Sequence, residues 1–154
     1  MIQLQVRPYY RGQISETSLI GAAETALQEC QPGVVVVGIL ITGDAEIRQL
    51  NLQYRQIDSP TDVLSFNGDY IDPETGINYL GDIIISVPRA KKQAVTAGHS
   101  LAQELELLAI HGVLHLCGFD HATNKQQQKM WSIQAEILSR INNPLSGNFL
   151  VMTE

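Results

Sequence analysis

The chain has 154 residues, of which 44% are hydrophobic and 17% are charged, and its formal net charge is −6. This length and composition suit one globular domain over residues 1–154, and the acidic balance argues against a protein that coats nucleic acid through excess lysine and arginine. The longest apolar run, at about 34–41, is too short to cross a bilayer, and the N-terminus lacks the features of a signal peptide. We therefore expect a cytoplasmic protein that does not bind membranes.

The first third of the chain alternates between strand and helix patterns. Residues 2–6 alternate apolar and polar side chains, which indicates an edge or half-buried strand that ends at Pro8. Apolar residues at helical spacing predict an amphipathic helix over 14–29, with Pro32 in its stop signal. The β-branched run VVVVGILIT that follows predicts a strand buried on both faces, and residues 44–55 again have a helical pattern.

The remaining strands and the chain end are read in the same way. Residues 61–66 and 81–86 predict two strands separated by a turn-rich segment. Pro88 opens a further helix at a position where its missing N–H does no harm. The residues from about 143 to 154 have no clear period, so we expect a loosely held tail.

Two capping boxes open the last two helices. Ser100 with Gln103 and Thr123 with Gln126 have the spacing in which the two side chains satisfy each other's backbone N–H groups. The helix after Ser100 is apolar on nearly every side, and Gly118 is its natural stop. We expect this helix to be central and buried.

Three of the four histidines lie in the segment HGVLHLCGFDH, residues 111–121. His111 and His115 are four residues apart on a predicted helix, so they share one face. A sharp turn after the helix can bring His121 to the same place. Three neutral imidazoles and a water are the ligand set of a catalytic zinc ion, whereas structural zinc sites close all four positions and favour cysteine. The pattern predicts one Zn²⁺ bound by these three histidines and a water.

Other interpretations of these residues were weighed against a metal site. Histidines satisfied by backbone carbonyls would explain one imidazole in an apolar helix, but three at this spacing favour a metal because unpaired imidazole is costly to bury. Cys117 lies two residues after His115, roughly 200° around the helix, and should point away from the metal. Cys30 and Cys117 are the only cysteines, and in a reducing compartment we expect core thiols rather than a disulfide. His99 lies outside the motif and is expected to have a surface or capping role.

The histidine spacing resembles that of metzincin proteases, with one difference. Those enzymes need a glutamate directly after the first histidine as general base, and this chain has Gly112 there. Peptide hydrolysis by that route is therefore disfavoured. Hydrolysis itself is not, because a metal can still lower the pKa of its bound water to about 7 and polarise a phosphoryl oxygen.

A second candidate segment is NLQYRQIDSPTDVLSF, residues 51–66. Arg55 offers a planar set of donors suited to phosphate, although an isolated arginine is more often only a surface residue. Asp58 and Asp62 either cap the turn before the strand or pair with this arginine.

Together these segments resemble the YbeY family of endoribonucleases, also called rRNA maturation factors. The resemblance rests on residues 111–121, 50–66, 79–86 and 98–100. It implies an α/β (α+β) fold, in which a small mixed four-stranded sheet is packed by several helices and a central helix carries the histidines. This agrees with the order of elements predicted above.

The resemblance also implies an activity and its residues. The expected function is metal-dependent cleavage of single-stranded RNA in rRNA processing, near the 3′ end of small-subunit 16S rRNA, and in ribosome quality control. His111, His115 and His121 would be the zinc ligands, and Arg55 the functional arginine, so we expect Arg55 and His115 to be catalytic. The expected partners are single-stranded RNA and the small ribosomal subunit with its proteins, and DNA is not expected.

Several roles near this site stay open at the level of sequence. The general base is unassigned: Asp120 is the nearest acidic candidate, yet beside a ligating histidine it is at least as often a supporting or turn-forming residue. Tyr54 and Phe66 could hold a flexible RNA strand together with Arg55, although such aromatic residues are more often part of a core.

Two rival functions remain. One is a metal-dependent hydrolase of peptides or small molecules, because the histidines alone do not name a substrate. The other is a non-enzymatic ribosome assembly factor with a structural zinc, which a fourth protein ligand would support.

Overall fold

The computed structural model describes residues 1–31 and 33–145, so Pro32 and residues 146–154 lie outside it. Strands and helices alternate through the first half of the chain, and helices follow the last strand. In chain order the elements are β1 (Ile2–Val6), the 3₁₀ helix η1 (Pro8–Gln13), α1 (Glu16–Cys30), β2 (Val35–Thr42), α2 (Asp44–Arg55), β3 (Val63–Ile71), β4 (Asn78–Ser86), α3 (Val87–Ala97), α4 (Leu101–Leu116) and α5 (Asn124–Arg140).

The four strands form one mixed sheet in the order β1-β2-β4-β3. β1 and β4 both run parallel to β2, and β3 runs antiparallel to β4. The β-branched strand β2 is central and almost wholly buried, and β1 lies at an edge, as the sequence predicted. The other edge strand is β3, which pairs with β4 on one side only.

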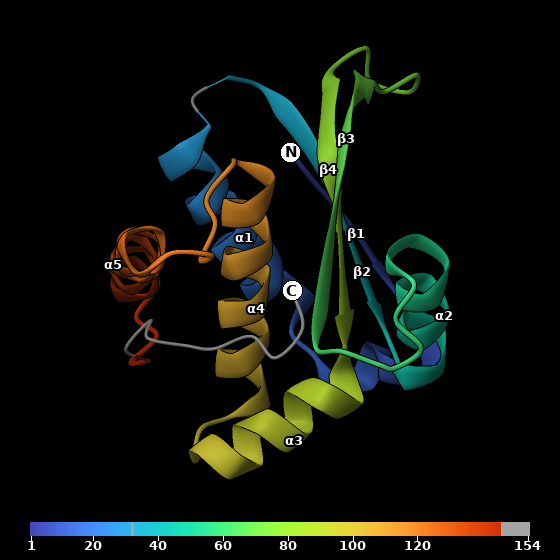
Figure 1. Cartoon of the computed structure of the whole chain (residues 1–154), viewed down its shortest axis with the longest axis vertical. Coiled ribbons are helices and arrows are strands. Elements are labelled where there is room, and N and C mark those ends of the chain that lie inside the picture. The colour runs from blue at the N-terminus through green and yellow to red at the C-terminus, as the bar shows by residue number, and fades with distance from the viewer. Residues whose placement is uncertain (32, 146–154) are drawn as a thin grey trace.

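Helices cover both faces of the sheet (Figure 1). α1, α4 and α5 lie on one side, α2 lies on the other, and α3 crosses near one end of the sheet. The main core fills the space between the sheet and the α1–α4 layer, and a smaller cluster joins Ile47 of α2 to Leu64 and Ile84 of the sheet. No helix within the described part of the chain is both long and apolar enough to span a membrane.

The central helix is α4, which is buried along most of its length as predicted. Both predicted capping boxes are present, at Ser100 with Gln103 and at Thr123 with Gln126. These caps define where α4 and α5 begin.

The β3–β4 hairpin is longer than the sequence predicted. The strands expected at 61–66 and 81–86 both extend into the turn-rich segment, where the rings of Tyr70 and Tyr79 stack with centroids 5.0 Å apart. Asp72 then closes the turn, because its carboxylate accepts hydrogen bonds from the Glu74 N–H and the Thr75 hydroxyl. The stacked pair of tyrosines stabilises the pairing of β3 with β4 in a segment whose local composition favours turns.

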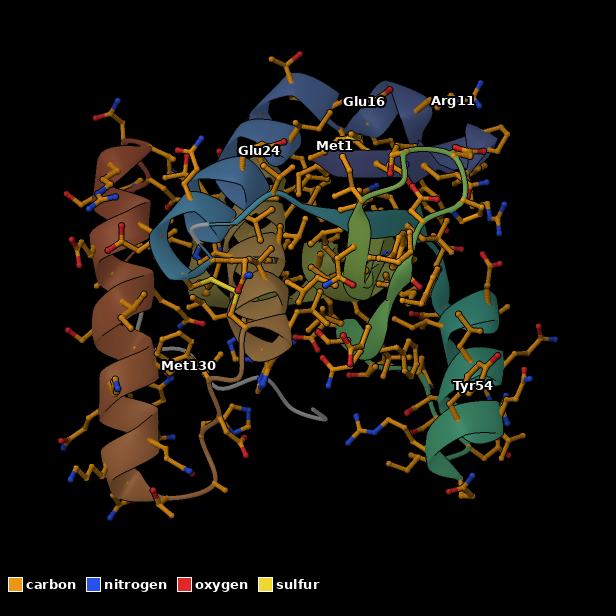
Figure 2. All side chains as sticks on the ribbon, turned by 90° about the horizontal axis from the view of Figure 1, so that it is seen from above. Met1, Arg11, Glu16, Glu24, Tyr54 and Met130 are labelled. Atoms are coloured by element: carbon orange, nitrogen blue, oxygen red, sulfur yellow. A yellow bond between two sulfur atoms is a disulfide. The ribbon has the colours of Figure 1, made fainter. Side chains whose placement is uncertain are left out.

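The cysteine prediction is wrong. Cys30 and Cys117 form a disulfide between the ends of α1 and α4, with their Cα atoms 6.2 Å apart (Figure 2). The residues are separated by 87 positions in sequence, so only the packing of α1 on α4 brings them together. Because disulfides are rare in reducing compartments, this pairing gives no support to a cytoplasmic location.

The beginning of the predicted loose tail is anchored to the domain. Asn143 is 5% exposed, and its side-chain amide donates to the Gln103 carbonyl at 3.2 Å and to Glu106 at 3.0 Å. The tail prediction for residues 146–154 falls outside the described residues.

Candidate metal centre

The second half of α4 packs closely on the sheet at Gly112. A Cβ atom placed on this glycine would lie 2.8 Å from Cγ2 of Ile83 on β4, closer than real Cβ contacts allow. Gly112 therefore permits the close approach of α4 to β4. Metzincins carry their glutamate at the position of Gly112, which here packs against the sheet. A glutamate side chain would not fit at this position, so it cannot supply a general base.

The three histidines of the motif converge at the end of α4. His111 and His115 lie one turn apart with their Nε2 atoms 3.0 Å from each other. The helix ends at Leu116 and is capped by Cys117, and Gly118, with a φ of 99°, adopts a backbone conformation that side chains disfavour. The turn brings His121 into the group, and one nitrogen from each of the three rings lies within 4.8 Å of the others.

The spacing and chemistry of these nitrogens fit a zinc ion. Two nitrogens bound to tetrahedral zinc at 2.0–2.1 Å are about 3.3 Å apart, close to the separation of His111 and His115. Nε2 of His121 is buried and has no hydrogen-bond partner among the described residues, a costly state that a metal would relieve. Within residues 1–31 and 33–145 the group has no fourth His, Cys, Asp or Glu member. The donor set thus matches three protein ligands with one position left for a small molecule.

Gln134 of α5 orients the first histidine, and sequence reasoning missed it. His111 is fully buried, and its Nδ1 lies 2.6 Å from Oε1 of Gln134. An amide oxygen only accepts, so Nδ1 carries the proton and Nε2 presents its lone pair to the cluster. Gln134 is the polar member of a helix face that is otherwise apolar, between Met130 and Ile137. That pattern was the available signal.

Burial keeps two of the three histidines neutral. Burial and the neighbouring His115 lower the pKa of His111 to about 3. Burial and then His121 also lower the pKa of His115. Neutral imidazole is the form that binds a metal, so no proton has to be displaced from these two rings near pH 7.

A cavity of about 400 Å³ lies beside the histidines. Arg55, at the end of α2, and His115, on α4, both line it, together with Ser65, Asn67 and Asp120. α2 and α4 lie on opposite faces of the sheet (Figure 1), so the two side chains meet across the edge strand β3. The structure therefore places the two residues predicted to be catalytic around one cavity.

The remaining sequence candidates fall into different places. Asp120 accepts a hydrogen bond from the backbone N–H of His121 at 2.7 Å and lines the cavity that contains His115. Asp58 pairs with Arg48 at 2.7 Å on the surface. Asp62 is 1% exposed and lies at the start of β3, accepting from the Val63 N–H and from Gln93.

The two aromatic candidates form a pair on the α2 side of the sheet. The ring centroids of Tyr54 and Phe66 are 5.3 Å apart. Phe66 packs against the smaller core cluster, whereas Tyr54 is 59% exposed on α2 (Figure 2). Phe66 is thus partly a core residue, and Tyr54 is available to an external partner.

Comparison with known proteins decides the family. Residues 10–142 match the family model described as Endoribonuclease YbeY. The chain belongs to the YbeY family. Endoribonuclease YbeY of Gloeobacter violaceus is 46% identical over 114 residues, which cover 71% of this chain and 59% of that protein. Endoribonuclease YbeY of Dehalococcoides mccartyi is 39% identical over 157 residues, covering 94% of this chain and 95% of the relative.

A solved structure resembles the whole YbeY-family domain. The solution structure of TM1509 from Thermotoga maritima has a TM-score of 0.59 and 25% sequence identity, and the match covers 100% of this chain and 99% of the other. The α+β fold with a small mixed sheet, predicted from the sequence, is confirmed.

In this YbeY-family chain the fourth histidine belongs to a buried polar cluster on the earlier part of α4. The side chain of His99 is only 13% exposed, and its Nε2 lies 2.5 Å from Oε1 of Glu104, which is fully buried. The expectation of a surface or capping role for His99 is therefore wrong. The local sequence does not predict this contact, because an acidic residue in the first turn of a helix is ordinarily explained by the helix dipole.

Replacing Glu104 by glutamine should favour the folded state increasingly as the pH rises. Burial raises the pKa of the Glu104 carboxyl, although the contact with His99 acts in the opposite direction. The folded protein therefore holds this proton more tightly than the unfolded chain does. The stability contributed by this group is complete below its unfolded pKa and is lost as the pH rises through its folded pKa. Glutamine has no such proton to lose.

Urea unfolding midpoints of the wild type and Glu104→Gln, measured at several values between about pH 5 and about pH 8, test this. Burial also raises the pKa of Asp62, which is present in both proteins, and its charge acts on Glu104, so the comparison reports the Glu104 carboxyl together with this interaction. A difference between the two midpoints that stays constant over this range contradicts the assignment.

Proposed function

We propose that this protein is a zinc-dependent endoribonuclease that hydrolyses phosphodiester bonds in single-stranded RNA. The observation that carries the proposal is the convergence of three imidazole nitrogens beside a cavity that also contains Arg55. The family and the names of its relatives supply the substrate class, since those proteins are called endoribonucleases. The whole 1–154 chain is proposed to act as one catalytic domain.

Each residue has a defined task in this proposal. His111, His115 and His121 hold the ion, and Gln134 keeps His111 in the tautomer that binds it. A bound zinc ion lowers the pKa of its water to about 7 and polarises a phosphoryl oxygen. Arg55 binds the phosphate from the other wall of the cavity and stabilises the negative charge that develops during cleavage. We therefore propose Arg55 and His115 as catalytic residues.

The proposed setting is rRNA processing. We propose single-stranded rRNA as substrate, near the 3′ end of the small-subunit 16S rRNA, with the small ribosomal subunit and its proteins as partners and the cytoplasm as location. An acidic chain can bind a flexible single strand through a local site, because the strand can be splayed and stacked on single side chains. The exposed Tyr54 close to Arg55 suits such a contact.

Both rival functions have an observation against them. A peptide hydrolase of the metzincin kind needs a glutamate where Gly112 packs on Ile83. A structural zinc needs a fourth protein ligand, and Cys117, the nearest thiol in sequence, is engaged in a disulfide.

Cleavage of defined RNAs tests the proposal. Purified protein is incubated with one RNA sequence as a single strand and as a duplex, with added zinc and after treatment with a chelator. We expect cutting of the single strand only, lost on chelation and restored by zinc. Equal cutting in all samples would reveal a contaminating nuclease and leave the proposal without support.

Arg55→Ala should reduce cleavage while leaving metal binding intact. The arginine lines the cavity from α2 and is not among the zinc-binding nitrogens. Its loss should lower kcat/KM roughly 10–100-fold, the range for one charge-assisted hydrogen bond to a phosphate. Zinc content by elemental analysis serves as the control, with Arg48→Ala on the exposed part of the same helix as the matched variant. Full activity of Arg55→Ala would remove this residue from the mechanism.

A further inference from the structure

The edge strand β3 divides its side chains between the two faces of the sheet. Leu64 and Phe66 belong to the small cluster under α2, whereas Val63 belongs to the main core under α4. Alternation therefore directs Ser65 and Asn67 to the α4 side, and both line the cavity that contains His115. This strand supplies the floor between the histidines and Arg55.

The hydroxyl of Ser65 is the group on this strand that points to a ligand. Its Oγ is buried and has no hydrogen-bond partner among the described residues. Most buried hydroxyl groups in folded proteins are paired, and an unpaired one at a cavity wall calls for a ligand that supplies the missing bond. Asn67, two residues further on the same face, is exposed and adds a second neutral polar group.

The chemistry of these two side chains suits a sugar hydroxyl better than a phosphate. Phosphate oxygens only accept hydrogen bonds, and in this cavity Arg55 offers charged donors for them. The hydroxyl of Ser65 and the amide of Asn67 are neutral, and each can both donate and accept. The ribose 2′-hydroxyl also donates and accepts, and it is the group that distinguishes RNA from DNA. A cavity of about 400 Å³ falls within the range of about 300–1,000 Å³ typical of small-ligand sites.

We propose that Ser65 and Asn67 form a subsite for the ribose 2′-hydroxyl of the nucleotide bound beside the histidines, and that this subsite makes the protein prefer RNA to DNA. The inference rests on the proposed function, because it assumes that a single-stranded nucleic acid occupies the cavity. It goes further by naming the substrate group that is recognised, the 2′-hydroxyl, and the two residues that form hydrogen bonds with it.

Binding of matched RNA and DNA strands tests the subsite. Dissociation constants are measured by fluorescence anisotropy with the purified protein, on strands of one sequence and within the time over which a gel shows each strand to remain uncut. We expect Ser65→Ala and Asn67→Ala each to weaken RNA binding roughly 3–10-fold, as expected for one neutral hydrogen bond, and to leave DNA binding unchanged. Arg55→Ala should instead weaken the binding of both the RNA and the DNA strand. It should also reduce the slope of the logarithm of the binding constant against the logarithm of the salt concentration by about one.

The controls separate the subsite from the fold and from the proposed function. Ser139→Ala, at an exposed position on α5, should change neither affinity. Asn67 is exposed, so Asn67→Ala remains a test even where Ser65→Ala disturbs folding. If the wild type cuts and prefers RNA but both variants keep the wild-type ratio of RNA to DNA affinity, the subsite is refuted alone. If the wild type binds no single strand, the proposed function fails together with it.

Discussion

His115→Ala should abolish RNA cleavage and most zinc binding without unfolding the protein. The ring is only partly buried, and its Nε2 lies 3.0 Å from that of His111, so its loss removes one of three converging imidazoles. Two imidazoles cannot hold zinc against competition from water and buffer as three do. We expect cleavage to fall by roughly 1,000-fold or more, since loss of even one group that stabilises developing charge costs about 10²–10³ in kcat.

Elemental analysis after dialysis and single-turnover cleavage of a labelled strand measure these two effects. The matched control is His99→Ala, because it also removes a histidine that contacts α4 but lies outside the cluster. His99→Ala should retain zinc and cut RNA, although it breaks the contact with Glu104 and so lowers the melting temperature. Retention of a full equivalent of zinc by His115→Ala would mean that the three rings do not form the metal site.

The grouping of the three histidines was predictable because their arrangement is local. A spacing of four residues on a helix determines that His111 and His115 share a face, and a glycine after the helix allows the turn to His121. Gln134 is different, because it is 23 positions from His111 and on another helix. Its role depends on how α5 packs on α4, and the local sequence shows only that Gln134 is a polar residue on an otherwise apolar face of α5.

Arg55 and His115 line one cavity because of the topology of the fold, so this proximity also could not be read from the local sequence. α2 and α4 cover opposite faces of the sheet, and their residues meet only because β3 is an edge strand. The Cys30–Cys117 disulfide was missed for a related reason, since helix packing across 87 positions determines it. The sequence analysis expected reduced core thiols, and the packing of α1 on α4 brings the two sulfur atoms together instead.

Gly112→Ala should destabilise the wild-type fold but stabilise the Ile83→Ala variant. Alanine normally gains about 1 kcal/mol over glycine inside a helix. Here the new methyl group would lie 2.8 Å from Cγ2 of Ile83 and 3.0 Å from both Cγ1 and Cδ1. Because a β-branched side chain on a central strand has little freedom to move, the clash should outweigh the helical gain, with a net loss of about 1–2 kcal/mol.

The double-mutant cycle makes the sign of this effect diagnostic. Ile83→Ala alone removes the three crowding atoms and should cost about 2–5 kcal/mol, because it leaves a cavity between α4 and β4. Adding Gly112→Ala in that background fills part of the cavity and restores the helical gain, so urea midpoints should rise rather than fall. The same destabilisation in both backgrounds would show that close packing on Ile83 is not the reason for this glycine. A sign reversal would show that the helix carrying His111 and His115 is positioned by its contact with β4, which also explains why this fold has no place for the metzincin glutamate.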